Sequence, residues 1–350
     1  MDKLHETTVK FPNTDIWMDS CGEKELNYGL ERGISGATSN PTIICGVIAN
    51  ELEMWEPRVR QLAWECPEAS EDDLAWKLMY EISALRAQKL LPVFRAHRGK
   101  KGRLSMQTNA KYYRDAHRLL DQALEIHGLA ENMQVKIPAS QAGVQAMEEA
   151  TYHGVSINAT VCFTVAQAAA VAEAVERGLA RRRAEGLPVD EMSPVCTLMM
   201  GRTDDWLRDW CDSSDVVIDP ECLDWAGVAV MKEAYRIYQE RGYTTRLLMA
   251  ACRNHHHWSQ LLGGDLCMTI NYGWQKKLNG CGIPVEAHIG DPVPQRYLEQ
   301  LNTLPEFRKS FEEKGMAPEE FVNYGGFRHT LNGFLGSYDE LIRIIRRIIV

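Results

Sequence analysis

One lysine stands inside a run of apolar residues, where its amine would be kept away from water. Lys136 lies between Val135 and Ile137, in a segment with the length and the β-branched content of a short strand. Burial disfavours the ammonium form and lowers the pKa of a lysine, which leaves a neutral, nucleophilic amine. Such an amine can form a Schiff base with a carbonyl. The alternative is a lysine at a strand end whose stem reaches water.

Other polar residues also close short apolar runs. Asp19 directly follows one and is a candidate proton acceptor, although Asp in such a place is often a helix cap or turn residue. Asn40 precedes Pro41, and Asn-Pro is a frequent turn. Thr160 could be an ordinary strand threonine. Further candidates at strand ends are Gln107 and Asn158.

Two arginines follow apolar runs late in the chain. Arg202 and Arg253 together could hold a phosphate through charge-assisted hydrogen bonds. The alternative is a surface ion pair with Asp204 or Asp205.

The run 255–257 consists of three histidines. Adjacent residues on a helix do not face one ligand sphere, and no acidic partner stands at helical spacing from them. We therefore predict no metal site there.

Short apolar runs alternate with amphipathic helical patterns along the whole chain. The helical patterns include 78–91, 165–175 and a stretch from 225 that ends at Arg241-Gly242. Eight strands are predicted, at 16–18, 34–37, 103–106, 134–138, 155–159, 195–200, 246–250 and 266–270. Such alternation indicates a parallel sheet, since parallel neighbours need long crossovers. Without a GxGxxG or Walker loop, a closed (β/α)8 barrel fits better than an open nucleotide-binding sheet.

We expect one barrel domain over 1–350, because no repeat or low-complexity linker divides the chain. The extra length falls in a helical insert at 48–98, between the second and third strands, and in a helical C-terminal extension at 280–350. In a barrel of this kind the chemistry lies at the C-terminal ends of the strands, where the candidate residues are expected to meet.

The overall charge and the cysteines bound the class of protein. With 39 Lys and Arg against 48 Asp and Glu, the net charge is −9, which argues against a nucleic-acid partner. The one dense basic run, 181–183, fits a helix end. The first 12 residues lack the apolar core of a signal peptide, and no run is long enough to cross a membrane. Ten scattered cysteines suit reduced thiols, so we expect a cytoplasmic protein with no membrane partner.

Six ordered segments resemble the transaldolase family. They are IWMDS at 16–20, GATSNPTII at 36–44, VKIPAS at 135–140, GVSINAT at 154–160, GRTDDW at 201–206 and AACRN at 250–254. The resemblance covers roughly residues 13–275, with a weaker match to the C-terminus. It implies a (β/α)8 barrel and class I aldol chemistry, as in the pentose phosphate pathway, without a metal or an organic cofactor. The implied partners are a sugar phosphate donor and an aldehyde acceptor. Whether the protein forms a homo-oligomer stays open.

The resemblance also assigns roles to residues. Lys136 would form the Schiff base with a ketose phosphate, and Asp19 would take the proton of the C4 hydroxyl group. The three-carbon dihydroxyacetone unit left on the lysine would then pass to an aldehyde. The residues implied to bind the hydroxyl groups are Asn40, Asn158 and Thr197, those implied to bind the phosphate are Arg202 and Arg253, and Thr160 would act on a catalytic water.

Three positions depart from the family pattern. Gln107 stands where transaldolases have the Glu that works with Thr160, and an amide cannot exchange a proton at neutral pH. The related fructose-6-phosphate aldolases resemble this chain in having Gln there. Met199 replaces a Phe of transaldolases or a Tyr of those aldolases, and Ala251 replaces a phosphate-binding Ser.

These departures leave three alternatives to a transaldolase open. The first is a fructose-6-phosphate aldolase-like lyase, which releases the three-carbon unit. The second is a transaldolase-like enzyme for an unusual sugar. The third is a catalytically silent barrel that binds sugar phosphates, although the retained Lys136 and Asp19 argue against it.

Overall fold

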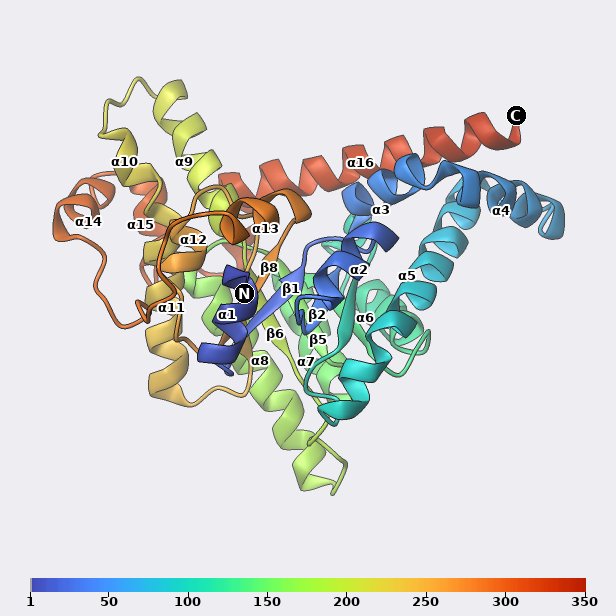
Figure 1. Ribbon diagram of the computed structural model, residues 1–350, viewed down its shortest axis with the longest axis horizontal. Helices are drawn as coiled ribbons and strands as arrows, with labels where there is room; N and C mark the ends of the chain where they lie inside the picture. The colour runs from blue at the N-terminus through green and yellow to red at the C-terminus, as the bar shows by residue number, and fades with distance from the viewer. Residues whose placement is uncertain (1) are drawn as a thin grey trace.

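A computed structural model describes residues 2–350, and its centre is a closed, all-parallel barrel with strands in the order β1 to β8 (Figure 1). Within the described residues no helix is long and apolar enough to cross a membrane. The strands are β1 (Thr14–Met18), β2 (Gly36–Thr38), β3 (Arg103–Gln107), β4 (Met133–Pro138), β5 (Ile157–Cys162), β6 (Val195–Leu198), β7 (Arg246–Met249) and β8 (Leu266–Ile270). The predicted (β/α)8 fold is therefore confirmed.

Helices connect the strands and cover the outside of the barrel. In the first half they are α1 (Lys3–Lys10), α2 (Glu23–Leu30), α3 (Pro41–Asn50), α4 (Leu52–Glu65), α5 (Glu71–Ala96), the 3₁₀ turn η1 (Ala110–Tyr112), α6 (Ala116–His127), α7 (Gln141–Tyr152) and α8 (Val165–Ala184). In the second half they are α9 (Met200–Ser213), α10 (Pro220–Leu223), α11 (Ala226–Arg241), α12 (His256–Ser259), α13 (Tyr272–Asn279), α14 (Gln295–Leu301), α15 (Pro305–Phe311), η2 (Pro318–Asn323) and α16 (Gly325–Ile349).

All eight predicted strands exist, and of them only β8 has the predicted bounds. β1 begins two residues earlier than predicted, and β3, β4 and β7 differ by one residue at one end. β2 begins two residues later than predicted, and β6 ends at Leu198 because Met200 already belongs to α9. β5 begins two residues later and ends three residues later than predicted, and its pairing with β6 shifts register between Ala159 and Cys162, where Val161 has φ +52°. Asn158 and Thr160 therefore lie within β5, and the expectation that they close this strand is wrong. An irregularity of this kind follows from three-dimensional pairing and has no signature in hydrophobic periodicity.

Helix ends follow the sequence signals closely. α11 stops at Arg241 because Gly242 adopts a left-handed conformation with φ +63°, which closes the helix. α3 begins where the side chain of Asn40 accepts a hydrogen bond from the Ile43 backbone N–H at 2.9 Å, with Pro41 in the first turn. These two signals fix where α3 begins, after β2, and where α11 ends, before β7.

A close contact between neighbouring strands shapes the barrel interior. Trp17 of β1 packs on the backbone of Gly36 at the start of β2, and a Cβ atom at that position would lie 2.6 Å from the indole ring. Only glycine leaves room for the ring there, so this pair fixes how closely β1 and β2 approach. Asp19 directly follows β1, and Thr38 is the last residue of β2. The close approach of the two strands brings these residues together.

The C-terminal helix crosses the end of the barrel at which the strands terminate. α16 packs against α3, α4, α5 and α9, and Figure 1 shows it running along that side of the molecule. A separate apolar cluster lies between this helix and the barrel, and it joins Phe327, Leu331 and Phe334 of α16 to Phe163 and Met199. The tail is thus part of the wall around the strand ends.

Candidate active site

A cavity of about 110 Å³ lies at the C-terminal ends of the strands. The residues that line it come from at least six of the eight strand–helix units and from α16. They are Asp19, Thr38, Asn40, Lys136, Thr197, Met199, Arg202, Ala250, Ala251, Arg253, Thr269, Asn271 and Phe334. Eight residues singled out in the sequence thus share one cavity, at the end of the barrel where such sites are expected.

Lys136 is the buried cation of this cavity. It lies in the middle of β4, its residue is only 4% exposed, and Nζ forms no hydrogen bond or ion pair with residues 2–350. The pKa of the ammonium group is lowered to about 8, chiefly by burial. The charge of Arg202 acts in the same direction, and Asp19 acts against both. With this pKa roughly a tenth of the amine is neutral at pH 7, and it faces a cavity that a carbonyl compound can enter.

Asp19 is held in place from the neighbouring strand. Its Oδ1 accepts a hydrogen bond from Thr38 Oγ1 at 2.6 Å, and its backbone N–H donates to the Ile270 carbonyl at 3.1 Å. The cap position of α2 is taken by Gly22, so Asp19 is not a helix cap. The carboxylate lines the cavity with Lys136, which is the geometry that a proton acceptor near the lysine needs.

A chain of hydrogen bonds runs across the barrel beneath the cavity. Thr197 Oγ1 donates to Asn158 Oδ1 at 2.6 Å, and Asn158 Nδ2 donates to Ser105 Oγ at 3.0 Å. Ser105 in turn donates to the side-chain oxygen of Gln134. Asn158 is fully buried and pairs in register with Lys136. The chain fixes Thr197, which lines the cavity, relative to the strand that carries the lysine.

Gln107 and Thr160 lie on the strands that flank β4. Gln107 is in register with Lys136, and Thr160 is in register with Pro138. Both are buried, and neither Gln107 Oε1 nor Thr160 Oγ1 has a hydrogen-bond partner among the described residues. Buried polar atoms of this kind need a partner, and a water molecule or a substrate hydroxyl group would supply one.

The two arginines reach the cavity but differ in their partners. Arg253 forms an ion pair with Asp205 at 3.0 Å, so the surface ion pair expected as an alternative exists for this residue. Arg202 has no hydrogen bond or ion pair within residues 2–350, and its guanidinium carbon lies 5.5 Å from the centre of the Phe334 ring. Burial and the nearby Arg253 lower the pKa of Arg202, which stays charged. One unpaired and one paired guanidinium group thus form the positive side of the cavity.

A close backbone approach places these arginines side by side. A Cβ atom on Gly201 would lie 1.8 Å from the Ala251 carbonyl oxygen, and Ala251 itself has φ +62°. Glycine at 201 therefore lets the start of α9 press against the loop that follows β7. Arg202 directly follows Gly201, and Arg253 lies two residues after Ala251. The contact therefore brings the two arginines to the same cavity.

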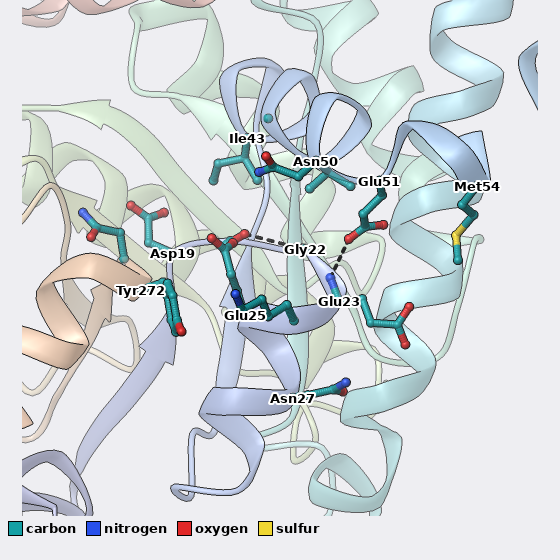
Figure 2. Close-up of a pocket in the computed structure, with 15 residues that line it drawn as sticks. Asp19, Gly22, Glu23, Glu25, Asn27, Ile43, Asn50, Glu51, Met54 and Tyr272 are labelled. Carbon is teal, nitrogen blue, oxygen red and sulfur yellow. Dashed lines mark hydrogen bonds between the residues drawn. The ribbon is translucent and has the colours of Figure 1, made fainter. Parts of the chain in front are cut away.

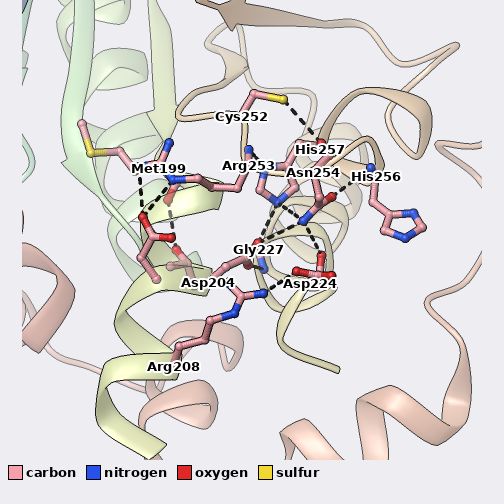
Figure 3. Close-up of polar contacts among 12 residues, drawn as sticks. Met199, Asp204, Arg208, Asp224, Gly227, Cys252, Arg253, Asn254, His256 and His257 are labelled. Atoms are coloured by element: carbon pink, nitrogen blue, oxygen red, sulfur yellow. Dashed lines mark hydrogen bonds and ion pairs between the residues drawn. The ribbon is translucent and has the colours of Figure 1, made fainter. Parts of the chain in front are cut away.

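A buried His–Asp pair supports the loop that carries Arg253 (Figure 3). The Arg253 backbone N–H donates to His257 Nδ1 at 3.2 Å, so the other ring nitrogen carries hydrogen and donates to Asp204 at 2.8 Å. Asp204 also accepts a hydrogen bond from the Gly227 backbone N–H at 2.8 Å. Burial raises the pKa of Asp204, and the neighbouring His257 acts to lower it. The interpretation of the histidine run as a structural feature fits this position.

The sequence candidates and the observed site overlap strongly but not completely. Asn40 lines the cavity while its side-chain oxygen caps α3, so it has both of the roles considered for it. Asn158, Gln107 and Thr160 lie outside the residues that line the cavity. Residues that the sequence reasoning missed are Thr38, Asp204, His257, Asn271 and Phe334. Spacing along the chain gives no signal for Asp204 with His257, because 53 residues separate them.

Comparison with known proteins agrees with this architecture. Residues 16–319 match the family described as transaldolase/fructose-6-phosphate aldolase. The chain is similar to proteins named transaldolase from Thiobacillus denitrificans (29% identity over 233 residues, 64% of each chain) and Saccharopolyspora erythraea (28% over 233 residues, 64% of this chain and 62% of that one). A third, from Neisseria gonorrhoeae, is 26% identical over 244 residues, 66% of this chain and 65% of its own. The match spans slightly less than two thirds of the length of these relatives. The chain belongs to the transaldolase/fructose-6-phosphate aldolase family.

Proposed function

We propose that this protein transfers a three-carbon dihydroxyacetone unit from a ketose phosphate, of the fructose 6-phosphate or sedoheptulose 7-phosphate type, to an aldehyde. Lys136 Nζ attacks the C2 carbonyl of the donor, and loss of water gives a Schiff base. Asp19 takes the proton of the C4 hydroxyl group, the C3–C4 bond breaks, and an aldehyde leaves. The electron pair of that bond moves to the iminium nitrogen, so the lysine carries an enamine until a new aldehyde arrives.

One observation carries this proposal. Lys136 is buried, has a pKa lowered to about 8, and shares a cavity with a carboxylate and two arginines. A lysine with only a structural role would be expected to donate hydrogen bonds, yet Nζ donates none to residues 2–350. The names of the relatives, transaldolase, agree with this chemistry.

The remaining residues can each take part through contacts they are placed to make. Arg202 and Arg253 supply charge for the phosphate, and Asp205 must release Arg253 or share it when the phosphate binds. Asn40 and Thr197 line the cavity and offer hydrogen bonds to the hydroxyl groups of the three-carbon unit, and Asn158 would bind these groups by exchanging its bond to Thr197 for one to the substrate. Gln107 and Thr160 would hold the water molecule that is released when the Schiff base forms and consumed when it is hydrolysed.

A second candidate function is a fructose-6-phosphate aldolase-like lyase, and Gln107 favours it. An amide can orient a water molecule but cannot accept its proton, which can cost about 10²–10⁴-fold in a proton-transfer step. A slow transfer leaves more time for the enamine to be protonated and released as dihydroxyacetone.

One experiment separates these functions. The protein is incubated with fructose 6-phosphate, with or without erythrose 4-phosphate, and sedoheptulose 7-phosphate and free dihydroxyacetone are measured together. Formation of mainly sedoheptulose 7-phosphate supports the transaldolase. Mainly free dihydroxyacetone, at the same rate with and without the acceptor, supports the lyase. If neither fructose 6-phosphate nor any other ketose phosphate is turned over, the proposal fails and a silent sugar-phosphate-binding barrel takes its place.

We also place the protein in the cytoplasm. All ten cysteines are free, and seven of them are buried. Cys162 and Cys196 have sulfur atoms 3.8 Å apart without a disulfide, which agrees with a reducing compartment. Fractionation with a tagged full-length chain would test this.

A further inference from the structure

A second, larger cavity opens directly beside the catalytic one (Figure 2). We call it the side groove. Its volume is about 920 Å³, whereas the catalytic cavity measures about 110 Å³. Asp19 and Asn271 line both, so the two spaces meet at the carboxylate proposed to handle the proton. Most ligand pockets measure about 300–1,000 Å³, a range in which the side groove falls and the catalytic cavity does not.

One wall of the side groove is acidic, but most of that charge is already compensated. Glu23 is paired with Arg86 and Lys89, and Glu51 is paired with Arg86. Glu25 differs, because its carboxylate forms no hydrogen bond or ion pair with any residue from 2 to 350. Figure 2 shows Glu25 between Asp19 and Gly22.

The remaining polar and apolar groups of the side groove suit a hydroxylated chain. The amide of Asn50 has no hydrogen-bond partner in the described part of the protein and is available to a ligand. Ile43 and Val47 of α3 and Met54 of α4 provide an apolar strip beside it. Lys24 is the one basic residue in the described part of the lining, and its ammonium group lies 6.0 Å from the centre of the Tyr272 ring. Among residues 2–350 no arginine lines the groove, in contrast to the catalytic cavity.

The proposed chemistry explains why a substrate would reach this groove. When the enamine on Lys136 attacks an aldehyde, the new alkoxide takes its proton from Asp19, so the aldehyde carbon must lie beside Asp19. From there the rest of the acceptor can run toward Arg202 and Arg253, or past Asn271 into the side groove. A phosphate group finds its charge partners on the first route. On the second route it would meet the free carboxylate of Glu25.

We propose that the side groove binds the distal part of a long, hydroxylated acceptor aldehyde that carries no phosphate at its far end. This inference rests on the proposed function and names a substrate class for the same site. Short sugar phosphates use the arginines, and longer uncharged acceptors use the groove.

The test compares four acceptors with sedoheptulose 7-phosphate as the donor, because transfer to glyceraldehyde 3-phosphate then gives fructose 6-phosphate and releases erythrose 4-phosphate as a distinct product. The short pair is glyceraldehyde and glyceraldehyde 3-phosphate. The long pair is 3-O-(2,3-dihydroxypropyl)glyceraldehyde and its terminal phosphate ester. We expect kcat/KM for the long neutral acceptor to exceed that for glyceraldehyde at least 10-fold. The terminal phosphate should remove most of this gain.

A variant that fills the groove provides the second arm. Gly46 of α3 lines the groove and is exposed, and a Cβ atom there would meet no other atom within 4 Å. Gly46→Phe should lower kcat/KM for the long neutral acceptor about 10-fold and leave glyceraldehyde 3-phosphate within twofold of the original protein. Gly336→Phe is the matched control, because Gly336 is also exposed, helical and without neighbours within 4 Å of a Cβ atom.

The outcomes separate this inference from the proposed function. Equal use of the two neutral acceptors, or an unchanged rate for the long acceptor in Gly46→Phe, would overturn the role of the groove while transfer to glyceraldehyde 3-phosphate persists. If glyceraldehyde 3-phosphate also fails to accept the unit from the original protein, the proposed transfer itself is at fault. If Gly46→Phe lowers kcat/KM only for the long neutral acceptor, and Gly336→Phe has unchanged kcat/KM for all acceptors, the result supports binding of the acceptor in the side groove.

Discussion

Two lysines in different parts of the molecule have the same lowered pKa and very different surroundings. Burial lowers the pKa of both Lys136, in β4, and Lys232, in α11, to about 8. Lys232 Nζ donates to the backbone carbonyls of His288 and Asp291 at 2.7 and 2.6 Å, which ties α11 to the segment after α13. Lys136 donates no hydrogen bond to any described residue and faces the catalytic cavity.

The difference shows that a lowered pKa does not by itself make a lysine a nucleophile. The protons of Lys232 are already donated to carbonyl oxygens, so its amine is not free to attack a substrate. Lys136 keeps its amine free, and Asp19 stands in the same cavity to handle a proton. Geometry therefore assigns the chemistry to Lys136, and the following predictions test that assignment from the largest expected effect to the smallest.

Removing the two amines should affect turnover very differently. Lys136→Met keeps the length of the side chain without the amine, and we expect kcat for three-carbon transfer to fall by about 10⁴-fold or more. Lys232→Met should stay within about threefold of the original protein. Both rates are measured by coupled assay, and circular dichroism checks that each variant is folded. Comparable losses in the two variants would contradict the distinction between the lysines.

The same two variants should change stability in opposite directions. Lys136→Met removes a buried cation without a hydrogen-bond partner, so the free energy of unfolding at pH 7 should rise by roughly 1–3 kcal/mol. Lys232→Met leaves carbonyl oxygens without their donor and should lower it by roughly 1–3 kcal/mol. The measurement is urea unfolding, analysed with the same dependence of the free energy of unfolding on urea concentration for all three proteins. A destabilised Lys136→Met would show that the ammonium group has partners that stabilise it.

The pH dependence should follow the pKa of Lys136. Attack needs the neutral amine, so adduct formation at low donor concentration should rise nearly tenfold per pH unit below pH 8 and level off above it. The folded chain binds fewer protons than the unfolded chain between pH 8 and the ordinary lysine value of 10.5. The stability gained in Lys136→Met should therefore shrink as the pH rises through this window. A rate that is independent of pH between 6 and 9 would contradict the lowered pKa.

The smallest effect is expected at the exposed ion pair beside the cavity. Asp205 holds Arg253, and both side chains are more than 40% exposed, so Asp205→Asn should change stability by less than about 0.5 kcal/mol. It should also free Arg253 and lower KM for a phosphorylated donor severalfold. Unphosphorylated donors provide the control, since their KM should not change. A raised KM for the phosphorylated donor would mean that Asp205 orients Arg253 more than it competes for it.

Much of the fold follows from local patterns in the sequence. Strand–helix alternation predicts eight strands, and all eight exist. Asp19 and Lys136 could be singled out because each is a charged residue directly after or inside an apolar strand. The shifted β5 was not predictable, because its irregularity depends on how it pairs with β6.

Contacts across long stretches of chain also escaped prediction. Phe334 reaches Arg202 only because α16 crosses the barrel end, and His257 meets Asp204 only once α9 and α12 are packed together. Neither pair has a spacing that sequence periodicity can detect. Such contacts depend on the tertiary arrangement of whole elements.

Trapping the Schiff base tests the central claim most directly. The protein is treated with fructose 6-phosphate and sodium borohydride, digested and analysed by mass spectrometry. We predict a reduced three-carbon adduct on Lys136 and none on Lys232, although the two lysines share a pKa of about 8. An adduct on Lys232 or another lysine, or no adduct on Lys136 with any ketose phosphate, would contradict the account.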